Sequence, residues 1–299
     1  MYPANPAEPG DPFPGLRSVV FLLLVFFALV SCRNSVPAAR PAGQATSALT
    51  REVPHPLPVD PPTKRKKKKI YLTFDDGPNP GTRNVLNIVQ EEQVPATFFI
   101  VGQHVFASIG QNQVWDSLKM ARNIELCNHS FTHGHNHYSR FYSDPAGVVR
   151  DISLTRDSLL PGNNIVRAPG RNCWRIDSLH YTDINQSRKA IDSLQAAGYV
   201  VFGWDLEWHY DARTLSLTNT ADQLLNQIDS LFRNEKTKTP DNIVILAHDQ
   251  VYRKPADSLQ LRELLKKLKR HDDYELALAS AYPGIGQPRT DTGQHPVPR

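Results

Sequence analysis

Two adjacent carboxylates, Asp75 and Asp76, end a short apolar segment and are followed by Gly77-Pro78. Two carboxylates at the end of a buried strand repel each other unless a positive charge lies beside them. A divalent metal ion supplies that charge, with one Asp as a ligand and the other free as a base. The alternative is an Asp pair that caps a helix or forms a turn.

A second polar segment, His129–His133, carries two histidines four positions apart. Residues i and i+4 share one face of a helical turn, which is a spacing typical of paired metal ligands. The spacing alone is a weak signal. Together with a strand-end Asp it predicts an Asp-His-His set that leaves coordination positions open for water and substrate. His135 and His137 follow closely, and we expect them to be exposed loop residues.

Short apolar runs alternate with helical patterns between residues 69 and 282, which predicts parallel strands joined by right-handed crossovers. The predicted strands are Ile70–Phe74, Ala96–Val101, Ile124–Cys127, Ile165–Arg167, Tyr199–Trp204, Ile243–Ala247 and Tyr274–Ala279. The predicted helices are Thr82–Glu92, Gln113–Arg122, Pro145–Leu160, Asn185–Ala197, Ala221–Phe232 and Asp257–Arg270. This pattern favours an α/β fold, a distorted and incomplete (β/α) barrel with about seven parallel strands, over an open sheet.

The chemically capable side chains share one place in this pattern, at the C-terminal ends of predicted strands. They are Asp75, Asp76, His129, Arg167, Trp204 and His248. In such barrels this end is the catalytic face. We therefore expect these residues to form one site.

Four segments, in this order and at these separations, resemble the NodB-homology polysaccharide deacetylases of carbohydrate esterase family four. They are Thr73-Phe74-Asp75-Asp76-Gly77-Pro78, His129-Ser130-x-x-His133, Arg167-Ala168-Pro169 and Leu246-Ala247-His248. The resemblance covers residues 69 to 281, and the first segment is highly specific. The family fold is a distorted (β/α) barrel, which agrees with the strand pattern.

The resemblance implies a metal site and a pair of proton-transfer residues. Asp76, His129 and His133 would hold a divalent metal, usually zinc, with cobalt, nickel or manganese as alternatives. The role of general base, acting on water at the metal, would fall to Asp75.

The resemblance also implies partners for that base. Arg167 would pair with Asp75 and fix its charge and direction. His248 would be the general acid that protonates the departing amine.

The third segment departs from the family pattern, which reads Arg-x-Pro-aromatic-Gly. Here Pro169 is followed directly by Gly170 and Arg171, and the aromatic residue is absent. The backbone N–H near this position binds the oxyanion in the family, so Gly170 or Arg171 is expected to supply it. The Arg171 side chain has two further interpretations, an electrostatic substitute for that N–H or a contact to an anionic substrate.

A further segment, Trp204-Asp205-Leu206-Glu207-Trp208, is one residue shorter than the family's Asp-x-x-Asp-Trp and carries Glu for the second Asp. By the resemblance, Asp205 would partner His248 and Trp208 would line the acetyl pocket. We expect Trp204 and Glu207 to contact the substrate as well. For both tryptophans the alternative is plain core packing.

The N-terminus carries an export signal, with Arg17 before the apolar run Val19–Val30. The sequence Leu29-Val30-Ser31-Cys32 resembles a bacterial lipobox, which predicts lipid attachment at Cys32. The alternatives are an ordinary signal peptide and a short membrane anchor in which the Cys occurs by chance. We expect a signal peptide over 1–31, a Pro- and Ala-rich disordered tether over 32–68, a deacetylase domain over 69–282 and a disordered tail over 283–299. The protein would then be exported and lipid-anchored to a bacterial membrane in the cell envelope.

The distribution of charge along the chain indicates which classes of partner the protein can bind. The run Lys64–Lys69 carries +6 and the chain carries +4, so the remainder sums to −2. That distribution argues against a nucleic-acid partner, and we expect a monomer. The run itself is either a site for anionic lipids or wall polymers, or a solvated end of the tether.

Cys127 and Cys173 form either one disulfide or two buried thiols.

These observations predict a metal-dependent hydrolase that removes N-acetyl groups from an N-acetylhexosamine-containing polysaccharide, such as peptidoglycan, a chitin-like polymer or a surface glycan. One alternative is an O-acetyl ester deacetylase acting on a xylan-type glycan. Another is a catalytically silent glycan-binding lipoprotein. The ester alternative stays open because the segments that contact substrate depart from the family pattern. The silent alternative is disfavoured because the residues of the metal site and of proton transfer are all retained: Asp75, Asp76, His129, His133, Arg167 and His248.

Overall fold

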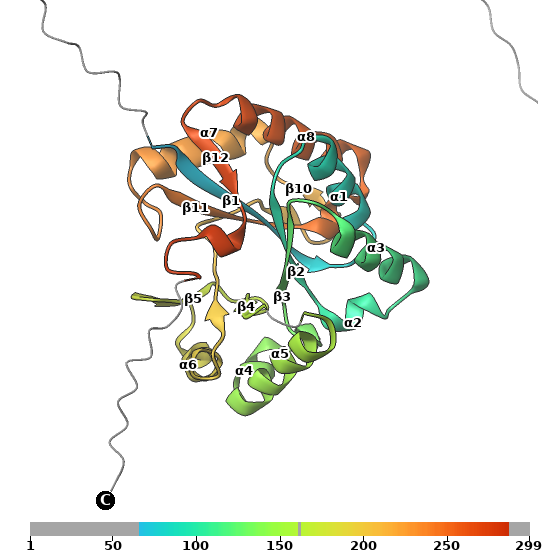
Figure 1. Ribbon diagram of the computed structural model, residues 1–299, viewed down its shortest axis with the longest axis vertical. Coiled ribbons are helices and arrows are strands. Elements are labelled where there is room, and N and C mark those ends of the chain that lie inside the picture. Colours follow the sequence, from blue (N-terminus) through green and yellow to red (C-terminus); the bar gives the residue numbers. More distant parts are fainter. Residues whose placement is uncertain (1–65, 161–162, 287–299) are drawn as a thin grey trace, which may run out of the picture. The chain divides into compact units, whose positions relative to one another are not determined.

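The computed structural model describes residues 66–160 and 163–286, which form a curled, mostly parallel sheet with helices packed against it (Figure 1). In chain order the strands are β1 (Lys68–Gly77), β2 (Ala96–Ile100), β3 (Ile124–Asn128), β4 (Ile165–Val166), β5 (Cys173–Ile176), β6 (Leu179–Thr182), β7 (Val200–Val201), β8 (Leu206–Glu207), β9 (Tyr210–Asp211), β10 (Ser216–Leu217), β11 (Asn242–His248) and β12 (Tyr274–Ala277). The α-helices are α1 (Thr82–Glu91), α2 (Gly102–Val105), α3 (Ile109–Met120), α4 (Tyr138–Tyr142), α5 (Pro145–Leu159), α6 (Arg188–Ala196), α7 (Ala221–Arg233) and α8 (Pro255–Arg270). Short 3-10 helices are η1 (His133–Asn136), η2 (Asn185–Ser187), η3 (Asp249–Arg253) and η4 (Ala279–Ala281).

The main sheet has the strand order β6-β5-β7-β4-β3-β2-β1-β11-β8, and β12 pairs with the first half of β1. Every pairing in it is parallel except those of β5, which is antiparallel to both of its neighbours. Because β6 and β8 end the sheet, it is a half-barrel, and the predicted incomplete α/β barrel is confirmed. The β5–β6 hairpin and the two-residue strand β8 were not predicted, since segments this short carry no clear periodicity.

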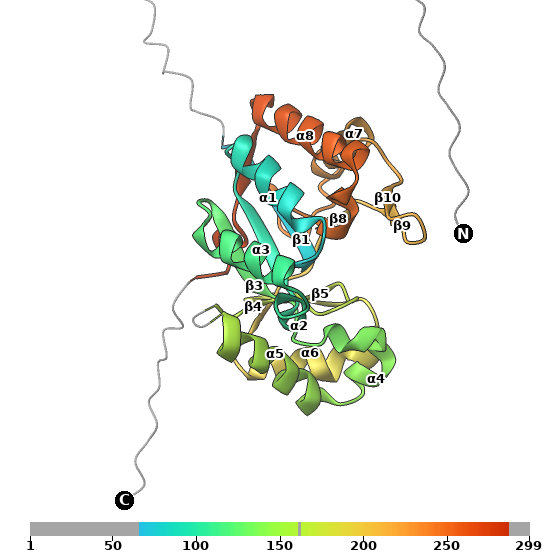
Figure 2. The ribbon, with the colours of Figure 1, turned by 90° about the vertical axis from the view of Figure 1, so that its right-hand side faces the viewer.

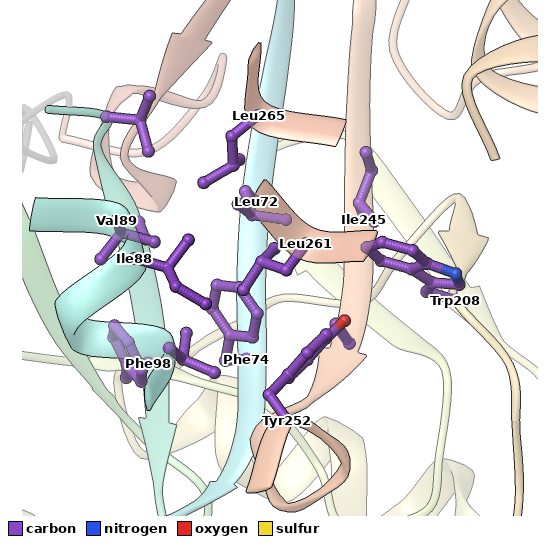
Figure 3. Packing of buried hydrophobic residues seen from close by; sticks show 14 of the residues in the cluster. Leu72, Phe74, Ile88, Val89, Phe98, Trp208, Ile245, Tyr252, Leu261 and Leu265 are labelled. Carbon is purple, nitrogen blue, oxygen red and sulfur yellow. The ribbon is translucent and has the colours of Figure 1, made fainter. Parts of the chain in front are cut away.

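Strand β1 crosses the centre of the domain, and its side chains alternate between two faces. Ile70, Leu72 and Phe74 are fully buried on the face that α1 and α8 cover, and Figure 3 shows Phe74 between these helices. Each such side chain contributes on the order of 1.5–3 kcal/mol when removed from water. Tyr71 packs in a separate buried cluster on the opposite face. The same alternation places Asp75 on that inner face, where polar chemistry is possible.

Helices lie in two groups on this sheet (Figure 2). Helices α1, α3, α7 and α8 pack against β1, β2 and β11 around one hydrophobic cluster. Helices α4, α5 and α6 pack around β4 and β7 in a second cluster. In α8, the predicted apolar stripe is buried as expected, at Leu261, Leu264, Leu265 and Leu268. The six predicted helices are all present with small changes at their ends.

One predicted strand, Tyr199–Trp204, is largely wrong. Only Val200–Val201 is a strand, although Phe202 N still donates to Val166 O. Beyond that point the backbone carbonyls bond to a side chain: Arg167 Nε donates to Phe202 O and Arg167 Nη2 to Gly203 O. A sequence pattern cannot reveal a buried arginine that replaces a neighbouring strand.

Cys127 and Cys173 are both buried free thiols in different hydrophobic clusters, so the structure has no disulfide between them and the alternative of two buried thiols holds. Burial raises the pKa of each thiol, that of Cys173 to about 12, so neither is poised to react. The predicted signal peptide and Cys32 lie outside the described residues. Among the residues that are described, no helix has the length and apolarity needed to cross a membrane.

Candidate active site

The three predicted metal ligands lie together. Asp76 Oδ1 lies 3.1 Å from His133 Nε2 and 3.5 Å from His129 Nε2. One ligand atom from each residue lies within 4.8 Å of the other two. The three residues come from two segments more than fifty positions apart, and the parallel pairing of β1, β2 and β3 brings them to one edge of the sheet.

The end of β1 aims both carboxylates at this edge. In a regular strand, Asp75 and Asp76 would point to opposite faces. Here the pairing of β1 with β2 shifts register between Asp75 and Gly77, and Asp76 adopts a left-handed backbone with φ 75°. A bulge of this kind redirects a side chain. His104 Nδ1 lies 2.7 Å from Asp76 O and, as the donor, holds that turn in place.

The two histidines do not share a helical turn, so the expectation that His129 and His133 lie on one face of a helix is wrong. His129 follows β3, and His133 begins the 3-10 helix η1. The chain turns between them because Ser130 has φ 67° and His133 φ 54°. Ser130 Oγ accepts from His133 N at 2.9 Å, and Asp151 Oδ2 accepts from the N–H groups of Phe131 and Thr132. The turn therefore brings the imidazoles within 5.1 Å of each other, centre to centre.

Hydrogen bonds at the far ring nitrogens orient both imidazoles. His129 Nδ1 lies 2.9 Å from Arg167 O, and His133 Nδ1 lies 2.8 Å from Asn136 Oδ1. Both acceptors are oxygens, so each Nδ1 is the donor and Nε2 of each ring is left directed at Asp76, where it can bind a metal. Asp76 Oδ1 is buried and has no hydrogen-bond partner among the described residues. Converging lone pairs around an orphaned carboxylate oxygen fit a divalent cation.

The pKa values of Asp76 and His133 also indicate that this cluster favours positive charge beside the Asp76 carboxylate. Burial alone would raise the pKa of Asp76, but the two imidazoles outweigh burial and hold that pKa well below its usual range. Burial alone would lower the pKa of His133, but Asp76 and Asn136 outweigh burial and raise it. The donor set, one carboxylate and two imidazoles, suits zinc and related divalent metals.

Asp75 and Arg167 form a buried ion pair behind the three ligands. Arg167 Nη1 donates to Asp75 Oδ1 at 2.7 Å, and both side chains are almost inaccessible to solvent. Arg167 also donates to Phe202 O and Gly203 O, and its guanidinium lies 4.1 Å from the centre of the Phe99 ring. Burial lowers the pKa of Arg167, and Asp75 opposes that fall. The second oxygen of Asp75 lies 3.6 Å from His129 Nε2 and accepts no hydrogen bond from the described residues, as a base requires.

His248 ends β11, where it is the register partner of Asp75 in β1. Both residues line a cavity of about 740 Å³ together with the three ligands. The His248 ring packs against Tyr210 at 5.1 Å between centres, and its Nδ1 is buried without a hydrogen-bond partner among the described residues. The predicted base and acid therefore lie on adjacent strands at one site.

The third segment is divided between two cavities. Gly170 lines the main cavity and has φ 62°, and a Cβ there would lie 2.7 Å from the Tyr138 ring. Arg171 N donates to Ala168 O, so it is not free to bind an oxyanion. Gly170 N has no such acceptor among the described residues and remains the candidate. The Arg171 side chain lines a neighbouring cavity instead of the main one.

The segment from Trp204 to Trp208 matches the prediction only in part. Trp204 and Glu207 line the main cavity as expected. Asp205 does not partner His248, because its oxygens accept from Lys238 N at 2.7 Å and Val244 N at 2.8 Å. Trp208 is fully buried in the core, as Figure 3 shows, and donates to Asn219 O. Glu207 rather than Asp205 therefore lines the site.

Several cavity residues were missed by sequence reasoning. His104, Asn136, Tyr210 and Gln250 all line the main cavity. Gln250 Nε2 donates to Tyr210 Oη at 3.2 Å, which fixes the ring that packs on His248. None of these residues stands at a predicted strand end, and only Asn136, three positions after His133, was close enough to a predicted ligand to be suspected.

Comparisons with known proteins show similarity to polysaccharide deacetylases in sequence and in fold. The sequence profile of the polysaccharide deacetylase family matches residues 63–160. A putative polysaccharide deacetylase, YheN of Bacillus subtilis, is 26% identical over 273 residues, which cover 84% of this chain and 86% of that protein. The peptidoglycan-N-acetylglucosamine deacetylase of Bacillus cereus is 26% identical over 62% of this chain and 61% of its own length. The fold resembles the catalytic domain of peptidoglycan N-acetylglucosamine deacetylase from Eubacterium rectale, with TM-score 0.53, 20% identity, and coverage of 76% of this chain and 95% of that one.

Proposed function

We propose that the chain is a polysaccharide deacetylase of the family whose profile matches residues 63–160, and that it removes N-acetyl groups from an N-acetylhexosamine-containing polysaccharide with the help of a divalent metal, most simply zinc. The observation that carries this proposal is the convergence of Asp76 Oδ1, His129 Nε2 and His133 Nε2 beside a separately held carboxylate. A purely structural site would not leave a buried carboxylate oxygen without a partner.

Asp76, His129 and His133 would hold the metal. A metal at this position would polarise the acetyl carbonyl and make a bound water more acidic. The hydrogen bonds to Arg167 O and Asn136 Oδ1 keep both imidazoles in the tautomer that binding requires.

The remaining steps use groups of this chain. Asp75 accepts a proton from the attacking water, and Arg167, which donates to its Oδ1, fixes the orientation of that carboxylate. Gly170 N–H donates to the oxygen of the acetyl group as negative charge develops there. His248, beside Asp75 on the adjacent strand β11, donates a proton to the amine as it leaves. Trp204 lines the cavity, where its ring can contact the sugar.

The test is product analysis by mass spectrometry on a panel of acetylated glycans with the metal-loaded full chain. N-acetylglucosamine oligomers and glycan strands from peptidoglycan should lose acetate. Release of acetate from acetylated xylan without cleavage of any amide would establish the ester alternative instead.

Replacement of Asp75 by Asn separates catalysis from binding. The variant should retain metal, measured by elemental analysis, and lose at least about 100-fold in turnover because the base is gone. A wild-type protein that holds one metal per chain and cleaves no acetylated sugar would establish the silent glycan-binding alternative.

We also propose that the chain is exported and anchored to a bacterial membrane through lipid at Cys32. The lipobox-like sequence and the long Pro- and Ala-rich segment after it support this proposal, because they would let the domain reach a polymer in the envelope. Cys32→Ser should move the protein from the membrane to the soluble fraction. A variant that stays in the membrane fraction would exclude this anchor. For the purified domain we propose a monomer, which its mass in solution tests.

A further inference from the structure

A second cavity, of about 560 Å³, opens beside the main one and shares Asn136 and Tyr138 with it. Its other lining residues are His137, Ser139, Arg140 and Arg171. No carboxylate lines it, and two guanidinium groups do. In a chain whose charge outside the basic run is slightly negative, this is a local concentration of positive charge.

Arg171 is held as a fixed donor in this cavity. Its Nη1 donates to Gly170 O at 2.6 Å and its Nε to Ser187 Oγ at 3.1 Å. Its guanidinium carbon lies 5.7 Å and 5.6 Å from the ring centres of Tyr138 and Tyr142. Within the described residues Nη2 has no acceptor, so a fixed, charged N–H group remains for a ligand.

Arg140 supplies the second charge. It lies on α4, its side chain is exposed, and it forms no ion pair with any described residue. The acidic residue nearby in sequence, Asp144, is paired with Arg150 at 3.2 Å instead. The two arginines line one cavity that no carboxylate lines, and guanidinium groups bind carboxylates with directed, charge-assisted hydrogen bonds.

We propose that this second cavity, beside the active site, is a subsite for a carboxylate-bearing sugar of the polysaccharide, recognised by Arg171 and Arg140. The identification of the ligand as a glycan rests on the proposed function. Because Tyr138 belongs to both cavities, a sugar that packs on its ring places its neighbour over the catalytic residues. The substrate is then an acidic polymer in which the N-acetylated residue adjoins one with a carboxylate, either a hexuronate or a lactyl ether.

The test compares each acidic glycan with the same glycan after chemical reduction of its carboxylates to alcohols, so that only the charge differs. The two glycans are an oligosaccharide that alternates N-acetylglucosamine with glucuronate, and peptide-free peptidoglycan strands, whose carboxylate is a lactyl ether. For the metal-loaded full chain, kcat/KM for the acidic form of the preferred glycan should exceed that for the reduced form about tenfold, which is the expected size of one charge-assisted contact. The glycan with the larger ratio identifies the source of the carboxylate.

Arg140→Gln and Arg171→Gln should each bring that ratio toward one. Arg150→Gln is the matched control, because it removes an exposed, paired arginine outside both cavities, and it should keep the wild-type ratio. A wild-type ratio of one for both glycans, or a ratio that survives both subsite variants, would overturn the proposal.

A direct measurement of glycan binding tests the subsite independently of the proposed catalytic activity. The Asp75→Asn variant should bind the acidic glycan about tenfold more tightly than its reduced form in calorimetry. If the wild type cleaves neither form but this preference in binding persists, the proposed activity fails and the subsite stands. If neither cleavage nor binding distinguishes the two forms, the subsite is refuted.

Discussion

Arg167 Nη1 donates to Asp75 Oδ1 at 2.7 Å, and both side chains are buried. The same arginine offers its backbone oxygen to His129 Nδ1 at 2.9 Å. One residue therefore orients both the proposed base and a proposed metal ligand. A disturbance at Arg167 should affect stability, metal binding and turnover together.

Arg167→Gln should lower the free energy of unfolding by about 3–5 kcal/mol, because it leaves the Asp75 carboxylate buried and without its counter-ion. Urea denaturation of the metal-free protein measures the change. Arg150→Gln, which breaks an ion pair whose side chains are 71% and 61% exposed, should cost less than about 1 kcal/mol. Equal effects from the two variants would show that burial of the Asp75 pair does not matter.

Asn136→Gly should weaken metal binding about 10- to 100-fold, since it removes the oxygen that orients His133. Glycine tolerates the left-handed backbone at this position, where φ is 59°, so the change isolates the side chain. Competition with a chelator measures the dissociation constant. Asn136→Asp retains an acceptor and should bind metal about as tightly as the wild type; a loss equal to that of Asn136→Gly would contradict the orienting role.

Gly170→Ala should slow turnover at least about tenfold and cost about 1–2 kcal/mol in stability, because the added Cβ meets the Tyr138 ring and the backbone is left-handed. Thermal unfolding and acetate release measure the two effects. Gly110→Ala is the control: its Cβ would find the nearest heavy atom at 3.9 Å, and alanine in helix α3 should add about 0.5–1 kcal/mol. Full activity in Gly170→Ala would exclude this backbone from oxyanion binding.

Asp249 should make the metal-free protein less stable as pH rises from about 4 to 8. Burial raises the pKa of Asp249 to about 8, with hydrogen bonds from Thr82 and Asn79 acting in the opposite direction. The unfolded carboxyl has an ordinary pKa of about 3.9. The folded state thus binds the proton more tightly, so this contribution to stability is complete below pH 4 and is lost as pH approaches 8.

The measurement for Asp249 is the melting temperature against pH in the presence of a chelator. Asp249→Asn stays neutral at every pH, so its melting temperature should fall less between pH 4 and 8 than that of the wild type. Parallel curves for the two proteins would show that Asp249 titrates normally in the folded state.

Local sequence patterns were sufficient to predict a large part of the fold and of the candidate site. The alternation along β1, the apolar stripe of α8 and the strand-end positions of the polar residues predicted the half-barrel and the edge at which the ligands meet. These features can be predicted from the sequence because the C-terminal ends of parallel strands all lie on one side of an α/β sheet, independently of the side chains between them.

Tertiary structure alone decided how that edge is completed. A register shift in β1 turns Asp76 toward the ligands, and left-handed residues rather than a helical turn bring His133 to His129. Trp208 enters the core, Asp205 bonds to backbone, and Arg171 faces a second cavity. Each outcome depends on contacts between segments far apart in the chain. Residue spacing reports which side chains are near in sequence, but it does not report which backbone groups need a partner after folding.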